Sequence, residues 1–139
     1  MLPSLSDLRD IDFPHHADGV AGLTVFDSTH VPFPIARIFS VRANAETTRG
    51  RHAHRLCSQL MVCLDGRCEV TCKDGSSIRR ILLERASHGL LIPPGIWAEQ
   101  RYLDEGATLM VLCDRPYDES DYVRDYQDFL AFRANRSNA

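Results

Sequence analysis

Two Asp-Gly dipeptides, at residues 65–66 and 74–75, constrain the fold of this chain more than any other feature. Asp-Gly between β-prone runs is a strong signal for a tight hairpin turn, because the turn requires positive φ angles that few residues tolerate. Short runs with regularly spaced apolar residues flank both dipeptides, at residues 59–64, 67–73 and 76–83. The spacing predicts a three-stranded antiparallel meander over residues 59–83.

The first predicted hairpin also indicates which side chains share a face. If residues 65 and 66 form the turn, Cys63 opposes Cys68, and one face is apolar except for one glutamine: Gln59, Met61, Cys63, Cys68, Val70 and Cys72. The other face mixes apolar and polar side chains: Leu60, Val62, Leu64, Arg67, Glu69 and Thr71. We expect the first face to line an interior, with Gln59 either inside that lining or reaching solvent. The second face is expected to be partly covered, for example by another subunit.

Further β-prone runs lie on both sides of the meander, at residues 23–26, 35–41, 89–92 and 108–113. Polar loops are expected over residues 42–50 and after the Pro-Pro-Gly turn at residues 93–95. Many short strands separated by turn residues are typical of a β-barrel or a β-sandwich.

The apolar period changes near the end of the chain. Aromatic and apolar residues recur there at helical spacing: Tyr122, Tyr126, Phe129 and Leu130. Acidic residues precede them, as suits the positive end of a helix, so we expect an amphipathic helix over residues 117–133. Residues 1–139 are then one domain with a loose N-terminal arm (1–22), a β-barrel (23–116) and this helix.

Composition excludes several classes of protein. The 139 residues include 16 basic and 19 acidic side chains, and a net charge of -3 argues against a nucleic-acid binder that works through bulk charge. No apolar run approaches the roughly 20 residues of a membrane-spanning helix. The first ten residues lack the pattern of a signal peptide, and the five cysteines include no CxxC pair. These features predict a reduced, cytoplasmic protein without a membrane or nucleic-acid partner.

The sharpest local feature is Arg49-Gly50-Arg51-His52-Ala53-His54. Residues two apart in a strand point to the same face, so His52 and His54 are expected to project together. Two such imidazoles either bind a metal or transfer protons near neutral pH. By the same alternation Arg49 and Arg51 point together to the opposite face. There an arginine can bind phosphate, or face solvent or a partner chain.

The spacing around this pair resembles the cupin family. His52-x-His54, then Gln59 and Gly66, resembles the first cupin motif, and residues 93–98 (Pro-Pro-Gly-Ile-Trp-Ala) resemble the second. In metal-binding cupins the ligands are two histidines, a glutamate and a later histidine. Here Gln59 and Ala98 stand at the last two positions, which leaves fewer than three strong ligands. The resemblance implies an all-β cupin (double-stranded β-helix or jelly-roll) barrel with a short C-terminal helix and no metal.

A closer resemblance extends over roughly residues 23–132. Four segments, residues 32–37, 49–54, 89–97 and 117–126, are similar to the dTDP-4-keto-6-deoxyglucose 3,4-ketoisomerases, the WxcM-like sugar-nucleotide cupins. The resemblance implies a cytoplasmic isomerase, usually a homodimer with exchanged strands, that needs no cofactor. Its substrate is a dTDP-linked 4-keto-6-deoxyhexose, in the biosynthesis of dideoxy-aminosugars for surface polysaccharides or secondary metabolites. Many members carry a tyrosine where this chain has Phe39-Ser40, and often a polar residue at Ala98.

The ketoisomerase chemistry suggests a role for each candidate residue. His52 or His54 is expected to move the proton on carbon, while the other positions or protonates the enediolate oxygens. Arg37 is the candidate for stabilising the enediolate, or else a surface arginine on an edge strand. Substrate-binding candidates are Arg49, Arg51, Gln59, Trp97 and Tyr126, although Trp97 and Tyr126 equally suit an ordinary core. The alternatives are a sugar-nucleotide-binding cupin without catalysis and a metal-dependent cupin enzyme.

Overall fold

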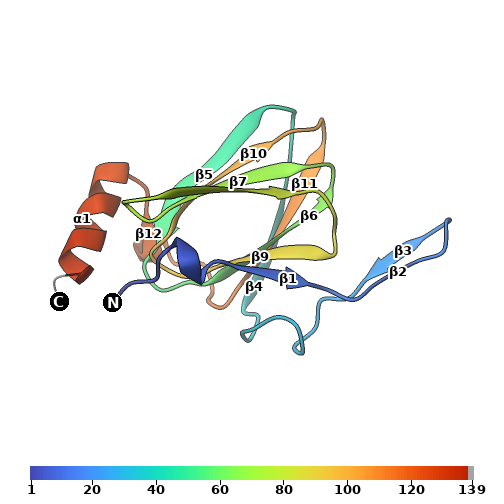
Figure 1. Ribbon diagram of the computed structural model, residues 1–139, viewed down its shortest axis with the longest axis horizontal. Helices are drawn as coiled ribbons and strands as arrows, with labels where there is room; N and C mark the ends of the chain where they lie inside the picture. Colours follow the sequence, from blue (N-terminus) through green and yellow to red (C-terminus); the bar gives the residue numbers. More distant parts are fainter. Residues whose placement is uncertain (138–139) are drawn as a thin grey trace.

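The computed structural model describes residues 1–137 and contains two five-stranded antiparallel sheets that face each other as a jelly-roll barrel (Figure 1). The first sheet has the order β1 (Arg9–Asp12), β9 (His88–Ile92), β6 (Gln59–Asp65), β11 (Ala107–Cys113), β4 (Arg37–Ala43). The second has the order β12 (Tyr122–Val123), β5 (Thr47–His54), β10 (Trp97–Tyr102), β7 (Cys68–Lys73), β8 (Ile78–Leu83). The predicted cupin-like, all-β fold is confirmed.

The remaining elements lie at the two ends of the barrel. An N-terminal 3₁₀ turn, η1 (Leu5–Asp7), precedes β1, and the small ribbon of β2 (His15–Ala17) and β3 (Gly22–Thr24) projects away from the barrel (Figure 1). A second 3₁₀ turn, η2 (Glu119–Asp121), precedes β12, and α1 (Tyr126–Ser137) packs against the end of the barrel beside β5 and β12 (Figure 1). No helix among the described residues is long and apolar enough to span a bilayer.

The first Asp-Gly turn does not form the predicted hairpin. β6 pairs with β9 and β11, whereas β7 pairs with β10 and β8, so the Asp65-Gly66 turn carries the chain from one sheet to the facing sheet. Local turn chemistry fixes the reversal of the chain but not whether the two strands share hydrogen bonds. The second turn does form a hairpin, in which Cys68 pairs with Leu83 and Lys73 with Ile78.

The predicted interior face is nevertheless correct, because the alternation of side chains holds whichever sheet a strand joins. Met61 and Cys63 on β6 and Cys68, Val70 and Cys72 on β7 are all buried in one core cluster. The Sγ atoms of Cys63 and Cys68 lie 3.4 Å apart. Gln59 is buried as well, so it belongs to this lining and does not reach solvent.

The other face of β6 is covered by the N-terminal segment of the same chain. Leu60 and Val62 are fully buried in a cluster with Ile11, Phe13 and Val31. A Cβ on Gly89 of β9 would lie 2.7 Å from the ring of Phe13, so the segment sits directly on the sheet. The expectation of a loose arm over residues 1–22 is therefore wrong for β1, which pairs with β9 along its whole length.

Two strands and one helix boundary also differ from prediction. The expected polar loops at residues 42–50 and after residue 95 contain the start of β5 and all of β10. The inward side chains of β5 and β10 include polar residues of the site described below. The sequence of these strands therefore lacks the alternation of apolar residues that would predict a strand. The helix begins at Tyr126 and not near residue 117, because Tyr122 and Val123 pair with His54 and Ala53 of β5.

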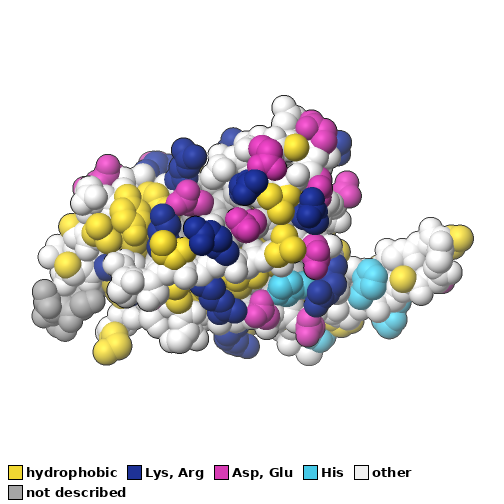
Figure 2. All heavy atoms as spheres, turned by 45° about the horizontal axis from the view of Figure 1, so that its top comes forward, with side chains coloured by type: hydrophobic (Ala, Val, Ile, Leu, Met, Phe, Trp, Pro, Cys, Tyr) yellow, Lys and Arg dark blue, Asp and Glu magenta, His cyan; other side chains and the backbone are white. Residues whose placement is uncertain are grey.

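The outer surface of the barrel carries mixed charge. Figure 2 shows basic and acidic side chains interspersed over the face it displays, without a continuous basic field. Several of these charges form exposed ion pairs, such as Arg67 with Asp104 and Arg101 with Glu46. On this face the arrangement agrees with the net charge of -3 and offers no continuous track for a polyanion.

The packing of the N-terminal segment predicts that Phe13→Ala destabilises the fold. Removing this buried ring, which is 4% exposed, should lower the free energy of unfolding by about 3–5 kcal/mol in urea titrations, the usual cost for a core phenylalanine. Val20→Ala, at a position 92% exposed, is the matched control and should leave it unchanged within about 0.5 kcal/mol. Equal stability of both variants would show that the segment is detached from the barrel in solution.

Candidate active site

A cavity of about 190 Å³ opens between the two sheets. The first sheet supplies an apolar wall and one amide: Phe39, Val41, Gln59, Met61, Leu109 and Val111. The second sheet and the segment after η2 supply most of the polar groups: Arg49, Gly50, His52, Gln100, Tyr102, Tyr122 and Arg124. A mostly apolar cavity with a few convergent polar groups is the usual form of a small-molecule site.

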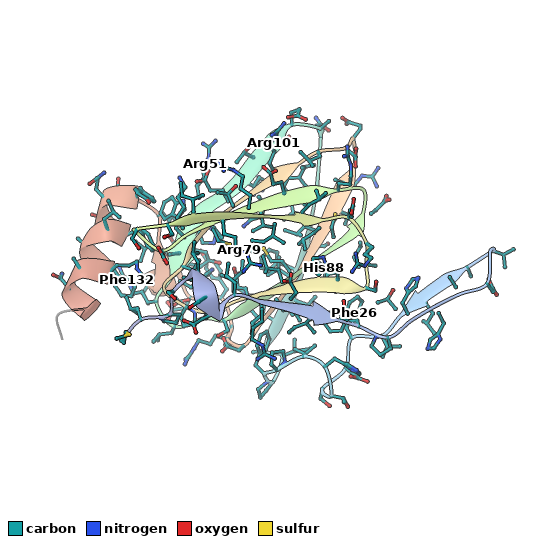
Figure 3. The ribbon with its side chains drawn as sticks, viewed as in Figure 1. Phe26, Arg51, Arg79, His88, Arg101 and Phe132 are labelled. Carbon is teal, nitrogen blue, oxygen red and sulfur yellow. The ribbon has the colours of Figure 1, made fainter. Side chains whose placement is uncertain are left out.

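A β-bulge in β5 decides which arginine enters the cavity. Gly50 and Arg51 have φ angles of +84° and +58°, and the pairing with β10 steps from Ala98 opposite His52 to Glu99 opposite Gly50. Arg51 is the extra residue, and it lies on the outer side of the sheet, 3.8 Å from Glu99 (Figure 3). The extra residue puts Arg49 in the cavity with His52, so the prediction that the two arginines point together is wrong.

The two predicted histidines lie side by side: His52 lines the cavity, and His54 is next to it, not among the lining residues. Their ring centroids are 5.0 Å apart with an interplanar angle of 85°, and the ring of Tyr122 lies 4.9 Å from His52 and 4.5 Å from His54. Tyr122 occupies this position because β12 pairs with the end of β5. The sequence placed Tyr122 on a helix, and no local pattern indicates its contact with the imidazoles.

Asp121, which the sequence analysis did not single out, fixes the ring of His54. Its Oδ2 lies 2.8 Å from Nδ1 of His54, and both side chains are buried. Its Oδ1 accepts the backbone N–H of Leu56 at 2.6 Å. Because a carboxylate accepts, Nδ1 of His54 carries the proton, and Nε2 has a free lone pair. This Nε2 and the Nδ1 of His52 are buried without a hydrogen-bond partner among the described residues.

Burial keeps both imidazoles neutral at neutral pH. Desolvation, and then the neighbouring His54, lowers the pKa of His52 to about 4. Desolvation also lowers the pKa of His54, against the opposing effect of Asp121, and the charge of Arg37 adds to the lowering. Neutral imidazoles can accept a proton from a substrate, which charged ones cannot.

Arg37 is held beside the pair and is not a free surface arginine. It begins β4 and is half-buried, and its Nη2 lies 3.4 Å from Sγ of Cys113. Its guanidinium lies 5.4 Å from the ring centroid of Phe39 and 5.6 Å from that of Tyr117. Such stacking on aromatic faces orients a guanidinium without neutralising it.

A second cation reaches the cavity from the chain after β12. Arg124 lines the cavity, and its guanidinium lies 4.3 Å from the ring centroid of Tyr122. Glu119 holds it through two hydrogen bonds of 2.9 Å. The sequence analysis did not select Arg124, because its predicted helix gave no reason to direct this side chain toward the histidines.

Trp97 and Tyr126 pack in the core between the barrel and α1. The ring centroids are 5.1 Å apart, and both rings contact Phe129, which is fully buried. Neither ring is among the residues that line the cavity. The structure therefore favours the core role that the sequence left open for both residues.

The residues present do not fit the divalent ion of metal-binding cupins. Ala98 is the cross-strand partner of His52 and offers no ligand atom, and the amide nitrogen of Gln59 lies 3.6 Å from the sulfur of Cys113. A different group, His54, Cys57 and Asp121, has ligand atoms within 4.8 Å of one another. There the hydrogen bond between His54 and Asp121 already occupies two of those atoms. Neither set offers three free strong ligands.

The barrel and its cavity define a small cupin-like protein with a histidine-pair site. The family described as FdtA: WxcM-like, C-terminal, matches residues 6–134, and the chain belongs to this family. It is 34% identical over 113 residues to a TDP-4-oxo-6-deoxy-α-D-glucose 3,4-oxoisomerase of Aneurinibacillus thermoaerophilus, covering 81% of each chain.

Solved structures of ketoisomerases are similar throughout the fold. A sugar 3,4-ketoisomerase from Thermoanaerobacterium thermosaccharolyticum, crystallised with TDP, matches with a TM-score of 0.90 and 32% identity, over 95% of this chain and 98% of that one. A 3,4-ketoisomerase from Helicobacter canadensis matches with a TM-score of 0.87 and 33% identity, over 92% and 98%. The family resemblance inferred from the sequence is confirmed.

The bulge predicts a specific effect of Gly50→Ala. A Cβ at this position would lie 2.5 Å from Oε1 of Gln100 and 3.0 Å from the carbonyl of Ala98, in addition to the strain of a positive φ. Gly19→Ala is the control, since it has φ +90° with nothing within 4 Å. Both variants should lose about 1–2 kcal/mol from backbone strain in urea titrations, and Gly50→Ala should lose more. An equal loss would mean that Gln100 moves aside without cost.

The pKa of His52 predicts a stability change with pH. The unfolded chain binds a proton near the ordinary value of 6.5 and the folded chain only near 4, so stability falls as the pH drops through this window. His52→Gln should show a shallower decline of unfolding free energy between these values. The imidazole of His52, followed by NMR, should titrate near 4. A midpoint at 6.5 would mean that His52 is solvated.

Proposed function

We propose that this protein is a sugar-nucleotide 3,4-ketoisomerase that converts dTDP-4-keto-6-deoxyglucose into a dTDP-3-keto-6-deoxyhexose. One observation carries the proposal: the half-buried His52, which lines the cavity, and the buried His54 beside it form a pair of neutral imidazoles in a chain that belongs to a family with 3,4-ketoisomerase members. The oxoisomerase and ketoisomerases to which it is similar carry this activity in their names.

The reaction needs proton transfers and no redox partner. The C4 carbonyl acidifies the hydrogen on C3, so a base can remove that proton and leave an enediolate across C3 and C4. A proton returned to C4, together with transfer of a proton from the C3 oxygen to the C4 oxygen, gives a C3 ketone and a C4 hydroxyl. Atoms and electrons balance within the substrate. Positioned imidazoles suit each step.

His54 is the better candidate for the base on carbon. Asp121 accepts the Nδ1 proton of His54, which leaves the lone pair of Nε2 free and stabilises the imidazolium once it forms. His52 has no carboxylate partner among the described residues, and its lowered pKa keeps it neutral, which suits a group that relays a proton between the oxygens. Phe39 lines the cavity without a hydroxyl, and of the two lining tyrosines, Tyr102 and Tyr122, it is Tyr122 whose ring contacts both imidazoles, which makes its phenol the candidate for the relay.

We assign Arg37 to the negative charge of the enediolate and the cavity arginines to the diphosphate of the substrate. Arg37 lies close enough to influence His54 electrostatically, so its guanidinium can stabilise the negative enediolate. Arg49 and Arg124 line the cavity and suit the diphosphate, since guanidinium groups bind phosphate oxygens in pairs. Gln59 and Gln100 offer amides to sugar hydroxyls. Arg51, on the outer side, contacts solvent or a second subunit.

A homodimer and a biosynthetic role complete the proposal. β4 ends its sheet with no partner strand on its outer side among residues 1–137, and Ile38 on it is 59% exposed. The projecting β2–β3 ribbon exposes Val20 and Leu23 (Figure 1). An open edge and a free arm suit exchange of strands with a second copy. We place the single-domain enzyme in the cytoplasm, in deoxysugar biosynthesis for polysaccharides or secondary metabolites.

The direct test is incubation with dTDP-4-keto-6-deoxyglucose and detection of the 3-keto product by NMR. His52→Asn and His54→Asn should each lower turnover by at least about 10²-fold, the scale of one general acid–base group, while the fold is retained. In heavy water, His54→Asn should abolish exchange of the C3 hydrogen, whereas His52→Asn should keep some exchange. Wild-type turnover in both variants would refute the mechanism.

One control variant and two further measurements separate the alternatives. His15→Asn, on the projecting ribbon, should leave turnover unchanged. Binding of the substrate without turnover in the wild-type protein would instead favour a sugar-nucleotide-binding cupin. Loss of activity after dialysis against a chelator, with recovery on adding iron, manganese or zinc, would favour a metal-dependent enzyme.

A further inference from the structure

Two N–H donors of the site converge on one buried sulfur. Nη2 of Arg37 lies 3.4 Å from Sγ of Cys113, and Nε2 of Gln59 lies 3.6 Å from the same atom. Cys113 is fully buried. The proposed mechanism gives roles to Arg37 and Gln59 but none to the thiol of Cys113.

The sheet register explains the convergence. Cys113 ends β11, the strand between β4 and β6, and pairs with Arg37 on one side and with Gln59 on the other. Direct cross-strand partners have side chains on the same face of a sheet, so the sulfur lies between the two donors. Cys113 is the residue of β11 whose direct cross-strand partners are Arg37 and Gln59, so its side chain is within reach of both.

Few groups besides this sulfur fix the direction of the Arg37 guanidinium. Among the described residues it forms no ion pair with a carboxylate, and its Nε is buried without a hydrogen-bond partner. The rings of Phe39 and Tyr117 lie against it, and Tyr122 is a second side-chain hydrogen-bond partner. A guanidinium that loses one of two acceptors can rotate, and an error of about 1 Å in a catalytic group can cost about 10²-fold in rate.

We propose that Cys113 is a positioning residue whose sulfur fixes the guanidinium of Arg37 and the amide of Gln59 against the substrate. The inference rests on the proposed function, which gives those two groups their tasks. The sulfur acts through them and does not touch the reacting atoms.

The surroundings favour the anionic form of this sulfur. The thiol of Cys57 and the donors from Arg37 and Gln59 lower the pKa of Cys113 to about 6 against the effect of burial. The same contact raises the pKa of Cys57, so Cys57 remains the protonated partner of the pair. The other titratable neighbour on these strands is Asp114, beside Cys57. Hydrogen bonds from a guanidinium to an anion are shorter and stronger than bonds to a neutral thiol.

The kinetic test compares Cys113→Ala with Cys113→Ser. Alanine removes the acceptor, so kcat should fall by about tenfold or more while KM changes by less than about twofold, because the enediolate contact forms after binding. Serine restores an acceptor and should keep kcat within about threefold of wild type. Cys72→Ala and Cys72→Ser are matched controls, since Cys72 is fully buried with no hydrogen-bond partner among residues 1–137, and both should retain wild-type kcat.

The spectroscopic test does not require turnover. The ultraviolet absorbance of thiolates should rise with a midpoint near pH 6 in the wild-type protein, and this transition should be absent in Cys113→Ser. Arg37→Ala should move the midpoint to higher pH, because the cation that stabilises the thiolate is gone. Cys72→Ser should leave the transition in place. Melting temperatures establish that each variant is folded.

Each outcome decides the proposal. An equal loss of kcat in both Cys113 variants would assign the residue to packing, and wild-type kcat in both would remove any role. A midpoint that Arg37→Ala leaves unmoved would break the link between the two groups. If the wild-type protein does not turn the sugar nucleotide over, the proposed function fails, and the absorbance measurements alone decide whether the sulfur holds Arg37.

Discussion

A buried hydrogen bond between Nδ1 of His54 and Oδ2 of Asp121 joins the barrel to the segment that follows it. The bond fixes one imidazole, and it also holds the turn from which β12 pairs with the end of β5. That pairing sets the positions of Tyr122 and Arg124 at the cavity. Because both partners are buried, replacing either one leaves a polar group without compensation, which is costly in a low-dielectric interior. One interaction therefore organises both the ring of His54 and the groups around it.

The barrel accommodates a polar site because its two sheets differ in character. The first sheet buries aliphatic and thiol side chains on both faces, and the N-terminal segment covers the outer one. The second sheet contributes polar side chains such as Arg49 and Gln100 to the same interior. The apolar wall keeps the imidazoles neutral by excluding water. The bulge at Gly50 and Arg51 directs Arg49 into the cavity and Arg51 to the outer side of the sheet. Most of the apolar packing thus lies in the first sheet, which also carries Arg37 and Gln59, and most of the polar lining of the cavity comes from the second sheet and the segment after it.

The cupin-like barrel lacks two of the ligands of metal-binding cupins, and the proposed function gives its histidine pair a role in proton transfer. Ala98 faces His52 where a further ligand is found in metal-binding cupins, and Gln59 bonds to a thiol. One nitrogen of each imidazole is buried without a hydrogen-bond partner among the described residues, and in the proposed reaction nearby cations would stabilise negative charge on oxygen. Such an arrangement of groups suits a reaction that moves a carbonyl group within the sugar without net oxidation.

The sequence by itself determined the all-β class, the inward face of β6 and β7, and the projection of two histidines on one side of a strand. Those features depend on a period of two residues and on spacing, which are local. Only the tertiary structure decided that the Asp65-Gly66 turn crosses between sheets, that Arg51 is a bulge residue, and that residues 117–125 form a 3₁₀ turn and a short strand in place of an α-helix. It also brought Asp121 to His54, across 67 positions of the chain. Such contacts depend on which strands pair. Pairing joins segments that are distant in the sequence, and no local sequence pattern specifies the partners.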